Sequence, residues 1–221
     1  MLLGIDTSLG TAVAVVEHDG VVRAEVESAD PRGHAEVIGT LIEDALAAAD
    51  ASAADVTHVA AGMGPGPFTG LRVGIAAARA FAMGRGIPAL PVVSHDAVAL
   101  GLLLGAALRG EDAAHGPAGG RFAVVTDARR REYAYTVYAG LDDDGLPVRV
   151  AEPALSPRDE LDAVLGGLGA ARRDAARVPA AMIALAAARA LDAGRSIGPH
   201  DALYLRSPDV TLAAPAQGAR A

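Results

Sequence analysis

The order strand, strand, strand, helix occurs twice in this chain of 221 residues, and no other feature constrains the fold as strongly. In the first copy, apolar runs at 2–8, 11–17 and 21–27 precede an amphipathic helical pattern at 35–50. In the second copy, runs at 121–126, 132–138 and 146–151 precede a helix, which we expect to begin at the capping-box pattern of residues 156–159. The first strand of each copy ends near an aspartate, Asp6 or Asp127.

A duplicated unit of this kind predicts an α/β chain with an actin-like ATPase (ribonuclease H-like) fold of two lobes. We expect the first lobe at residues 1–110, a smaller second lobe at 121–206 and a flexible tail at 207–221. Residues 166–177 are rich in Ala and Arg and do not resemble a strand, so we expect no strand there.

A glycine- and proline-rich elbow joins an expected strand at 56–61 to an expected helix from residue 70 to about 83. It is not a Walker phosphate loop, because no Gly-Lys-Ser/Thr follows, and it lacks the dinucleotide spacing of glycines. A plainer alternative is a rigid turn in which Thr69 caps the helix. The elbow residues of interest are Gly64, Pro65, Gly66, Phe68, Thr69, Gly70 and Arg72.

Composition excludes several classes of function. A net charge of −8 makes the chain a poor candidate to hold nucleic acid alone, and the absence of cysteine removes thiol chemistry and Cys-ligated zinc. The longest apolar run, 97–108, is shorter than the roughly 18 residues that span a bilayer. The N-terminus lacks a basic region and reaches Asp6 at once, so we expect no signal peptide, no membrane partner and a cytoplasmic location.

Several stretches together carry a family likeness. They are Leu3-Gly4-Ile5-Asp6-Thr7-Ser8, the elbow from Gly64 to Gly74, residues 87–94, Asp127-Ala128-Arg129 with Glu132-Tyr133, and Tyr204-Leu205-Arg206. The chain resembles the TsaB family, the non-catalytic dimerisation subunit of the bacterial complex that makes threonylcarbamoyladenosine in tRNA, next to the anticodon. The likeness covers most of the first lobe and thins after about residue 150. Members of that family usually carry a Gly-containing strand and loop between the two C-terminal helices. Residues 166–177 depart from this pattern, so the comparison with the family implies a trimmed second lobe.

This resemblance implies a scaffold without catalytic residues. Its partners would be a TsaD-type catalytic subunit and a TsaE-type ATPase, it would form a homodimer when alone, and it would meet tRNA only through the complex. The helix that begins near Leu71 is apolar on both faces, which favours a partner over one of them. The expected partner interface comprises Ile38, Ile42, Leu71, Ile75, Ala78 and Phe81.

An alternative is an independent actin-fold ATPase or kinase that binds MgATP or ADP between the lobes. Asp6 and Asp127 would then face one cleft and hold a hydrated Mg²⁺, unless each merely caps the turn that follows it. The candidate cleft comprises Asp6, Thr7, Ser8, Asp127 and Arg129. If the chain is a scaffold, this nucleotide site would be vestigial.

A metallopeptidase is a weaker alternative, because no two of the six histidines are four residues apart. We expect His34 and His95 to be helix caps or surface groups. Ser94-His95-Asp96 cannot form a catalytic relay, since consecutive residues of a helix point to different faces. Arg129-Arg130-Arg131 either contacts a phosphate or forms a solvated turn.

Overall fold

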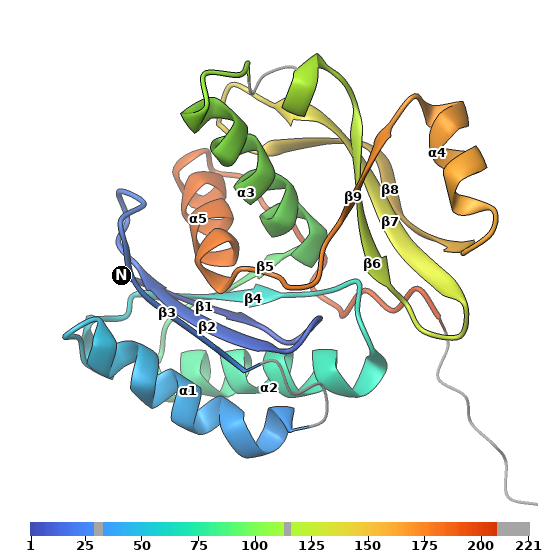
Figure 1. The fold of residues 1–221 in the computed structure, drawn as a ribbon. Helices are drawn as coiled ribbons and strands as arrows, with labels where there is room; N and C mark the ends of the chain where they lie inside the picture. The colour runs from blue at the N-terminus through green and yellow to red at the C-terminus, as the bar shows by residue number, and fades with distance from the viewer. Residues whose placement is uncertain (29–32, 113–115, 207–221) are drawn as a thin grey trace, which may run out of the picture.

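The computed structural model describes residues 1–28, 33–112 and 116–206, and it arranges them in two sheets with helices beneath, between and outside them (Figure 1). The expected tail at 207–221 lies outside the described residues. Within the described ranges, no helix combines the length and the apolarity needed to cross a membrane.

The first sheet has five strands in the order β3-β2-β1-β4-β5. Their bounds are β1 Leu2–Asp6, β2 Thr11–Val16, β3 Val22–Ser28, β4 His58–Gly62 and β5 Ala89–Val92. β1 pairs antiparallel with β2 and parallel with β4. Every residue of β1 and β2 is buried, because helices cover both faces of the sheet, and this explains why these strands are nearly continuous apolar runs.

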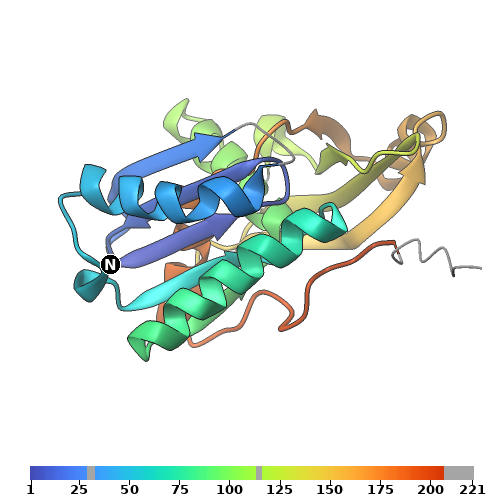
Figure 2. The same ribbon diagram turned by 90° about the horizontal axis from the view of Figure 1, so that it is seen from below.

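Two helices lie side by side under the first sheet, α1 (His34–Ala48) and α2 (Phe68–Arg85) (Figure 2). Two others, α3 (Ser94–Leu108) and α5 (Ala180–Asp192), lie between the two sheets (Figure 1). The largest apolar core joins α3 and α5 to both sheets, and it includes Leu2, Leu100, Phe122 and Ile183. The lobes therefore share one core.

The second sheet has the order β8-β7-β6-β9. It contains β6 Phe122–Asp127, β7 Glu132–Leu141, β8 Pro147–Pro157 and β9 Ala171–Asp174, with α4 Leu161–Leu168 packed outside it. The expected helix start at Ser156 was wrong: β8 continues to Pro157, and α4 has Glu160 as its N-cap.

The expectation that residues 166–177 hold no strand was also wrong. β9 pairs parallel with β6 at the edge of the sheet. Its side chains are not apolar; instead the Arg172 guanidinium lies 4.5 Å from the centre of the Tyr133 ring and forms an ion pair with Asp174. Backbone pairing and this cation–π contact replace the hydrophobic pattern by which strands are recognised in a sequence.

The last described part of the chain returns to the first sheet. α5 crosses β1 and β2, and Gly4 permits this, since a side chain there would collide with the carbonyl group of Ala180. Further on, the Leu203 N–H donates to the Met63 carbonyl at 2.7 Å. Residues 180–206 thus contact the first lobe as well as the second, where Arg195 forms an ion pair with Asp142, although we expected them in the second lobe.

Candidate functional site between the lobes

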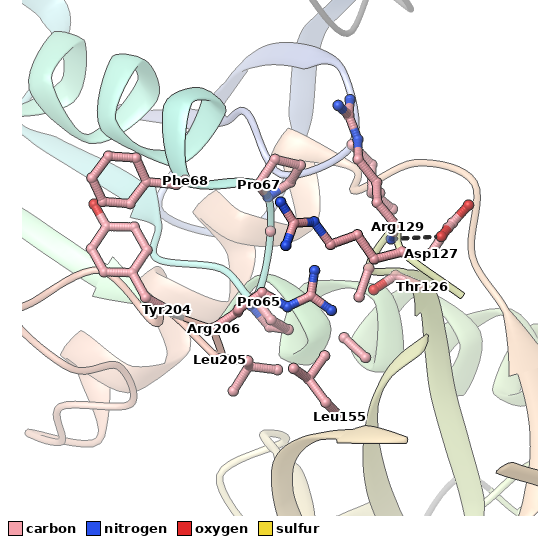
Figure 3. A pocket seen from close by; sticks show the side chains of 15 residues that line it. Pro65, Pro67, Phe68, Thr126, Asp127, Arg129, Leu155, Tyr204, Leu205 and Arg206 are labelled. Atoms are coloured by element: carbon pink, nitrogen blue, oxygen red, sulfur yellow. Dashed lines mark hydrogen bonds between the residues drawn. The ribbon is translucent and has the colours of Figure 1, made fainter. Parts of the chain in front are cut away.

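A cavity of about 260 Å³ lies where the elbow of the first lobe meets the β6–β7 turn of the second (Figure 3). The elbow, the turn, the β1–β2 connection and the final described segment all contribute to its wall. The lining residues are Leu9, Pro65, Gly66, Pro67, Phe68, Thr126, Asp127, Ala128, Arg129, Arg130, Ala134, Leu155, Tyr204, Leu205 and Arg206.

The elbow begins α2 two residues earlier than the pattern predicts. Pro67 is the N-cap and Phe68 the first helical residue, so Thr69 does not cap the helix with its side chain. The Phe68 ring lies on the Tyr204 ring with centroids 4.8 Å apart, and the Arg72 guanidinium lies 5.1 Å from the Phe68 centroid. The final segment of the described chain is thereby held against the elbow.

Asp6 is buried beneath the elbow and bonded to the chain itself. Its Oδ1 accepts from the Ser8 N–H at 2.7 Å, and its Oδ2 accepts from the Ser94 hydroxyl at 2.6 Å. The Ser94 oxygen also accepts from the Gly64 N–H at 3.0 Å. Burial raises the pKa of Asp6 to about 6, while these hydrogen bonds act to lower it. Asp6 thus links β1, the elbow and the start of α3.

The neighbouring candidates Thr7 and Ser8 are equally buried. The Thr7 hydroxyl donates to the Gly70 carbonyl at 2.7 Å, and Gly74 has no side chain because one there would collide with that of Thr7. Ser8 shares a 2.8 Å hydrogen bond with Ser94. These hydroxyls fix α2 and α3 to the end of β1.

Asp127 lies in a different setting, exposed at the cavity wall. Its Oδ1 accepts from the Arg129 N–H at 2.7 Å and from the Arg158 guanidinium at 2.8 Å. Partial burial would raise the pKa of Asp127, but these two donors hold it below its usual value. Asp6 lines a separate cavity with Glu27 and Arg177. The structure therefore brings Asp127 and Arg129 together with the elbow, and leaves Asp6, Thr7 and Ser8 outside this cavity.

The β6–β7 turn has an unusual backbone. Arg129, Arg130 and Arg131 have φ angles of 62°, 50° and 64°, in the left-handed region that disfavours residues other than glycine. The turn closes through Ala128 N–H to Glu132 O at 3.1 Å and Glu132 N–H to Arg129 O at 3.0 Å. Arg129 and Arg130 line the cavity, whereas Arg131 does not.

Ser94, His95 and Asp96 are all buried, and each bonds to a different part of the chain. His95 lies within hydrogen-bonding distance of the Thr136 and Thr126 hydroxyls, at 2.8 and 3.0 Å, and burial lowers the pKa of its imidazole to about 3. His34 is buried too, 2.8 Å from the Thr11 hydroxyl. The expectation that both histidines are caps or surface groups was therefore wrong; both are buried in the core, where each lies within hydrogen-bonding distance of a threonine hydroxyl.

Sequence reasoning missed a second buried cluster between the lobes. The Tyr138 hydroxyl donates to Asp96 at 2.7 Å, and the Arg149 guanidinium lies 3.3 Å from the same carboxylate. Burial raises the pKa of Asp96 to about 7 although Arg149 opposes the shift, and burial also raises the pKa of Tyr138. No spacing in the sequence marks this cluster, because its members come from α3, β7 and β8.

The expected partner interface is largely on the inner face of its helices. Leu71, Ile75, Ala78 and Ile38 belong to the core under the first sheet, while Ile42 and Phe81 are half-buried at its edge. The assignment of those four residues to a partner surface was wrong, because α2 is apolar on both faces and periodicity alone does not say which face meets the sheet. The exposed face of α2 carries Thr69, Arg72, Ala76, Ala80 and Met83.

In the part of the chain that the structure describes, no group of three or more histidine, aspartate or glutamate side chains could hold a metal ion. Asp6 and Asp127 do not line the same cavity, so the structure gives no support to the pair of magnesium ligands that the ATPase alternative requires.

Two lobes built on the same three-stranded unit, with their cavity at the lobe junction, define a protein of the actin-like class. The family model for TsaD, tRNA N6-adenosine threonylcarbamoyltransferase, matches residues 20–145. An uncharacterized protein of Mycobacterium tuberculosis is 39% identical over 163 residues, which cover 73% of this chain and 67% of that protein. The chain therefore belongs to the TsaD family.

Two further comparisons agree with this assignment. The tRNA threonylcarbamoyladenosine biosynthesis protein TsaB of Escherichia coli is 36% identical over 91 residues, 41% of this chain and 39% of TsaB. A crystal structure from Pseudomonas aeruginosa, described as similar to the peptidase YeaZ, superposes with a TM-score of 0.69 and 25% identity over 93% of this chain and 99% of that one. The expected actin-like fold and the resemblance to TsaB are confirmed.

Proposed function

We propose that this chain is a non-catalytic scaffold subunit required for threonylcarbamoyladenosine modification of tRNA next to the anticodon. It binds and stabilises a TsaD-type catalytic subunit, and a TsaE-type ATPase joins the assembly. The relatedness to TsaB of Escherichia coli and the match to the TsaD family support this proposal.

The observation that carries the proposal is the outer face of α2. Ala76, Ala80 and Met83 are exposed along one side of the helix, and the Met83 side chain is 79% accessible. On the neighbouring helix α1, a Cβ at Gly39 would have no atom within 4 Å apart from the adjoining residues and backbone of its own helix, so the packing of the chain does not require glycine there. Glycine in a helix costs about 0.5–1 kcal/mol relative to alanine. Small residues on neighbouring exposed helices suit close approach by the helices of a partner.

The charges on these two helices suggest how copies pair when the catalytic subunit is absent. α1 exposes Glu36, Glu43 and Asp44, whereas α2 exposes Arg72 and Arg79. A twofold axis would place the acidic helix of one copy against the basic helix of the other. The same surface would serve the homodimer and the complex, so the two associations would compete.

The hydrogen bonds of Asp6 argue against an independent ATPase or kinase. Such an enzyme needs this strand-end carboxylate to face magnesium and phosphate, but both oxygens of Asp6 accept hydrogen bonds within the chain. We accordingly assign no catalytic residue. With a net charge of −8, the chain would meet tRNA through its partner rather than directly.

The proposal is tested by Ala76→Glu with Ala163→Glu as the matched control. Both alanines are exposed in helices, and Ala163 lies on α4 of the second lobe. Glutamate at position 76 would place an unpaired charge in the contact, which costs at least about 2 kcal/mol, or a loss of about thirtyfold in affinity. The affinity for the TsaD-type subunit is measured by titration calorimetry.

We expect Ala76→Glu to weaken binding and Ala163→Glu to leave it unchanged, with both variants melting near the parent chain. Equal affinity of the parent chain and Ala76→Glu would show that the outer face of α2 is not the contact. Failure of the parent chain to bind any TsaD-type subunit would refute the scaffold function itself.

A further inference from the structure

We propose that the cavity between the lobes binds a small organic anion, a carboxylate or phosphate attached to an apolar or planar group, without a metal ion. This binding function is additional to the scaffold role and does not depend on it. Four features of the cavity support it: its charge, its backbone geometry, its walls and its size.

The charge of the cavity favours an anion. Arg129, Arg130 and Arg206 line it. The one carboxylate among the described lining residues, Asp127, is already bonded to Arg158, which is not among those residues. Arg206 forms an ion pair with Glu132 at the start of β7. Among the described residues, the Arg129 guanidinium makes no hydrogen bond or ion pair, and it influences Asp127 only through its field. A guanidinium in such a site is suited to a carboxylate or phosphate.

The backbone conformation of the turn is unfavourable in itself, so the rest of the chain must hold these arginines in place. Each left-handed residue other than glycine costs free energy, and three in succession persist only where the surroundings hold them. Asp127 supplies that support by bonding both the Arg129 N–H and the Arg158 side chain. The chain thus maintains a strained turn that places two arginines at a cavity, and strain of this kind is typical of binding sites.

The walls explain why the ligand needs an apolar part. The cavity is bounded mainly by carbon-rich side chains, namely Leu9, Pro65, Pro67, Leu155 and Leu205. Phe68 and Tyr204, whose rings are tilted by 41° with centroids 4.8 Å apart, form one side (Figure 3). A bare inorganic ion would leave this surface uncovered, whereas an aryl or alkyl group would bury it.

The size limits the ligand to a small molecule. A volume of about 260 Å³ is slightly below the usual range for ligand pockets, about 300–1,000 Å³. The cavity suits a single ring or a short chain that bears one anionic group.

The test is titration calorimetry of the full chain with phenyl phosphate, benzoate and inorganic phosphate, each with a chelator present. Phenyl phosphate and benzoate distinguish a phosphate ligand from a carboxylate, and inorganic phosphate tests the need for an apolar group. The variant is Arg129→Gly and its matched control is Arg131→Gly. Both replace a left-handed arginine with the residue that best tolerates that backbone, so both should fold, but only Arg129 lines the cavity.

We expect saturable binding of phenyl phosphate or benzoate that is tighter than that of inorganic phosphate. Arg129→Gly should weaken it about tenfold or more, as expected for the loss of a charge-assisted hydrogen bond, and Arg131→Gly should not. The proposal is overturned if neither organic anion binds, if Arg129→Gly binds as well as the parent chain, or if binding requires Mg²⁺. None of these outcomes bears on affinity for the TsaD-type subunit.

Discussion

Replacing Asp6 with asparagine should make the stability of the variant, relative to the parent chain, depend strongly on pH. Asp6 is 2% exposed, and burial raises the pKa of its carboxyl from 3.8 to about 6. In the parent chain the folded state therefore binds this proton more tightly than the unfolded state does. Its contribution to stability is fully present below about pH 3.8 and is lost as the pH rises to about 6.

The magnitude follows from the two pKa values. A rise from 3.8 to about 6 corresponds to about 3 kcal/mol, at about 1.4 kcal/mol per pH unit. Asparagine carries no charge, so the stability of Asp6→Asn does not fall in this way as the pH rises. Its amide can still accept from the Ser8 N–H and donate to the Ser94 oxygen. The free energy of unfolding of Asp6→Asn minus that of the parent chain should rise by about 2.4 kcal/mol between pH 4 and pH 7, because about a fifth of the whole effect falls below pH 4.

The assay is denaturant unfolding of both proteins by circular dichroism at several pH values from 4 to 7. Taking the difference between the proteins cancels titrating groups that they share, such as Asp96. Asp159→Asn, at an exposed acid with no role in the Asp6 cluster, is the control for an exchange of aspartate for asparagine. If the difference for Asp6→Asn rises no more steeply than that for Asp159→Asn, Asp6 is not a buried carboxyl with a raised pKa, and our assignment of it as a structural link is refuted.

Three further predictions concern stability. Arg149→Met should lower the free energy of unfolding by about 3 kcal/mol at pH 8, because it leaves the buried Asp96 carboxylate without its ion pair. The loss should be smaller at pH 5, since the pKa of Asp96 is raised to about 7 and its carboxyl is then protonated. Equal losses at both pH values would contradict this. Gly74→Ala should lower the stability of the chain by about 1–3 kcal/mol, because its methyl group would collide with Thr7. Gly39→Ala should instead stabilise α1 by about 0.5–1 kcal/mol, since space is free there. Thermal melts that rank the two variants the other way would refute the packing described. Arg131→Gly should raise the unfolding free energy by up to about 1 kcal/mol by relieving its left-handed backbone, and a clear fall would mean that the turn is not strained.

The sequence predicted the architecture well because the architecture depends on local patterns. β1 and β2 are apolar runs separated by a short turn, and Asp-Gly pairs at 19–20 and 144–145 lie in the turns that join β2 to β3 and β7 to β8. The elbow was also recognised, since its glycines and prolines interrupt a strand-to-helix junction. What failed locally was β9, whose residues are polar and whose strand conformation depends on pairing with β6.

The sites were harder to predict because they depend on which face of an element meets the rest of the chain. Ile75 and Ala76 are neighbours in an apolar helix, yet one is in the core and the other is exposed. Asp6 and Asp127 occupy equivalent positions in the two copies, but Ser94 closes off only the first. In the Asp96–Tyr138–Arg149 cluster, Asp96 bonds to a tyrosine that lies 42 positions further along the chain. Periodicity and spacing carry no information about such contacts.

The most direct test of the central claim is reconstitution of threonylcarbamoyladenosine on tRNA, measured by nucleoside mass spectrometry, with the TsaD-type and TsaE-type subunits supplied. The scaffold account predicts that modification requires this chain, that Asp6→Asn supports it as well as the parent chain does, and that Ala76→Glu does not. Full modification of tRNA without this chain would contradict the account. The account would also be contradicted if a well-folded Asp6→Asn variant failed to support modification and the parent chain bound MgATP.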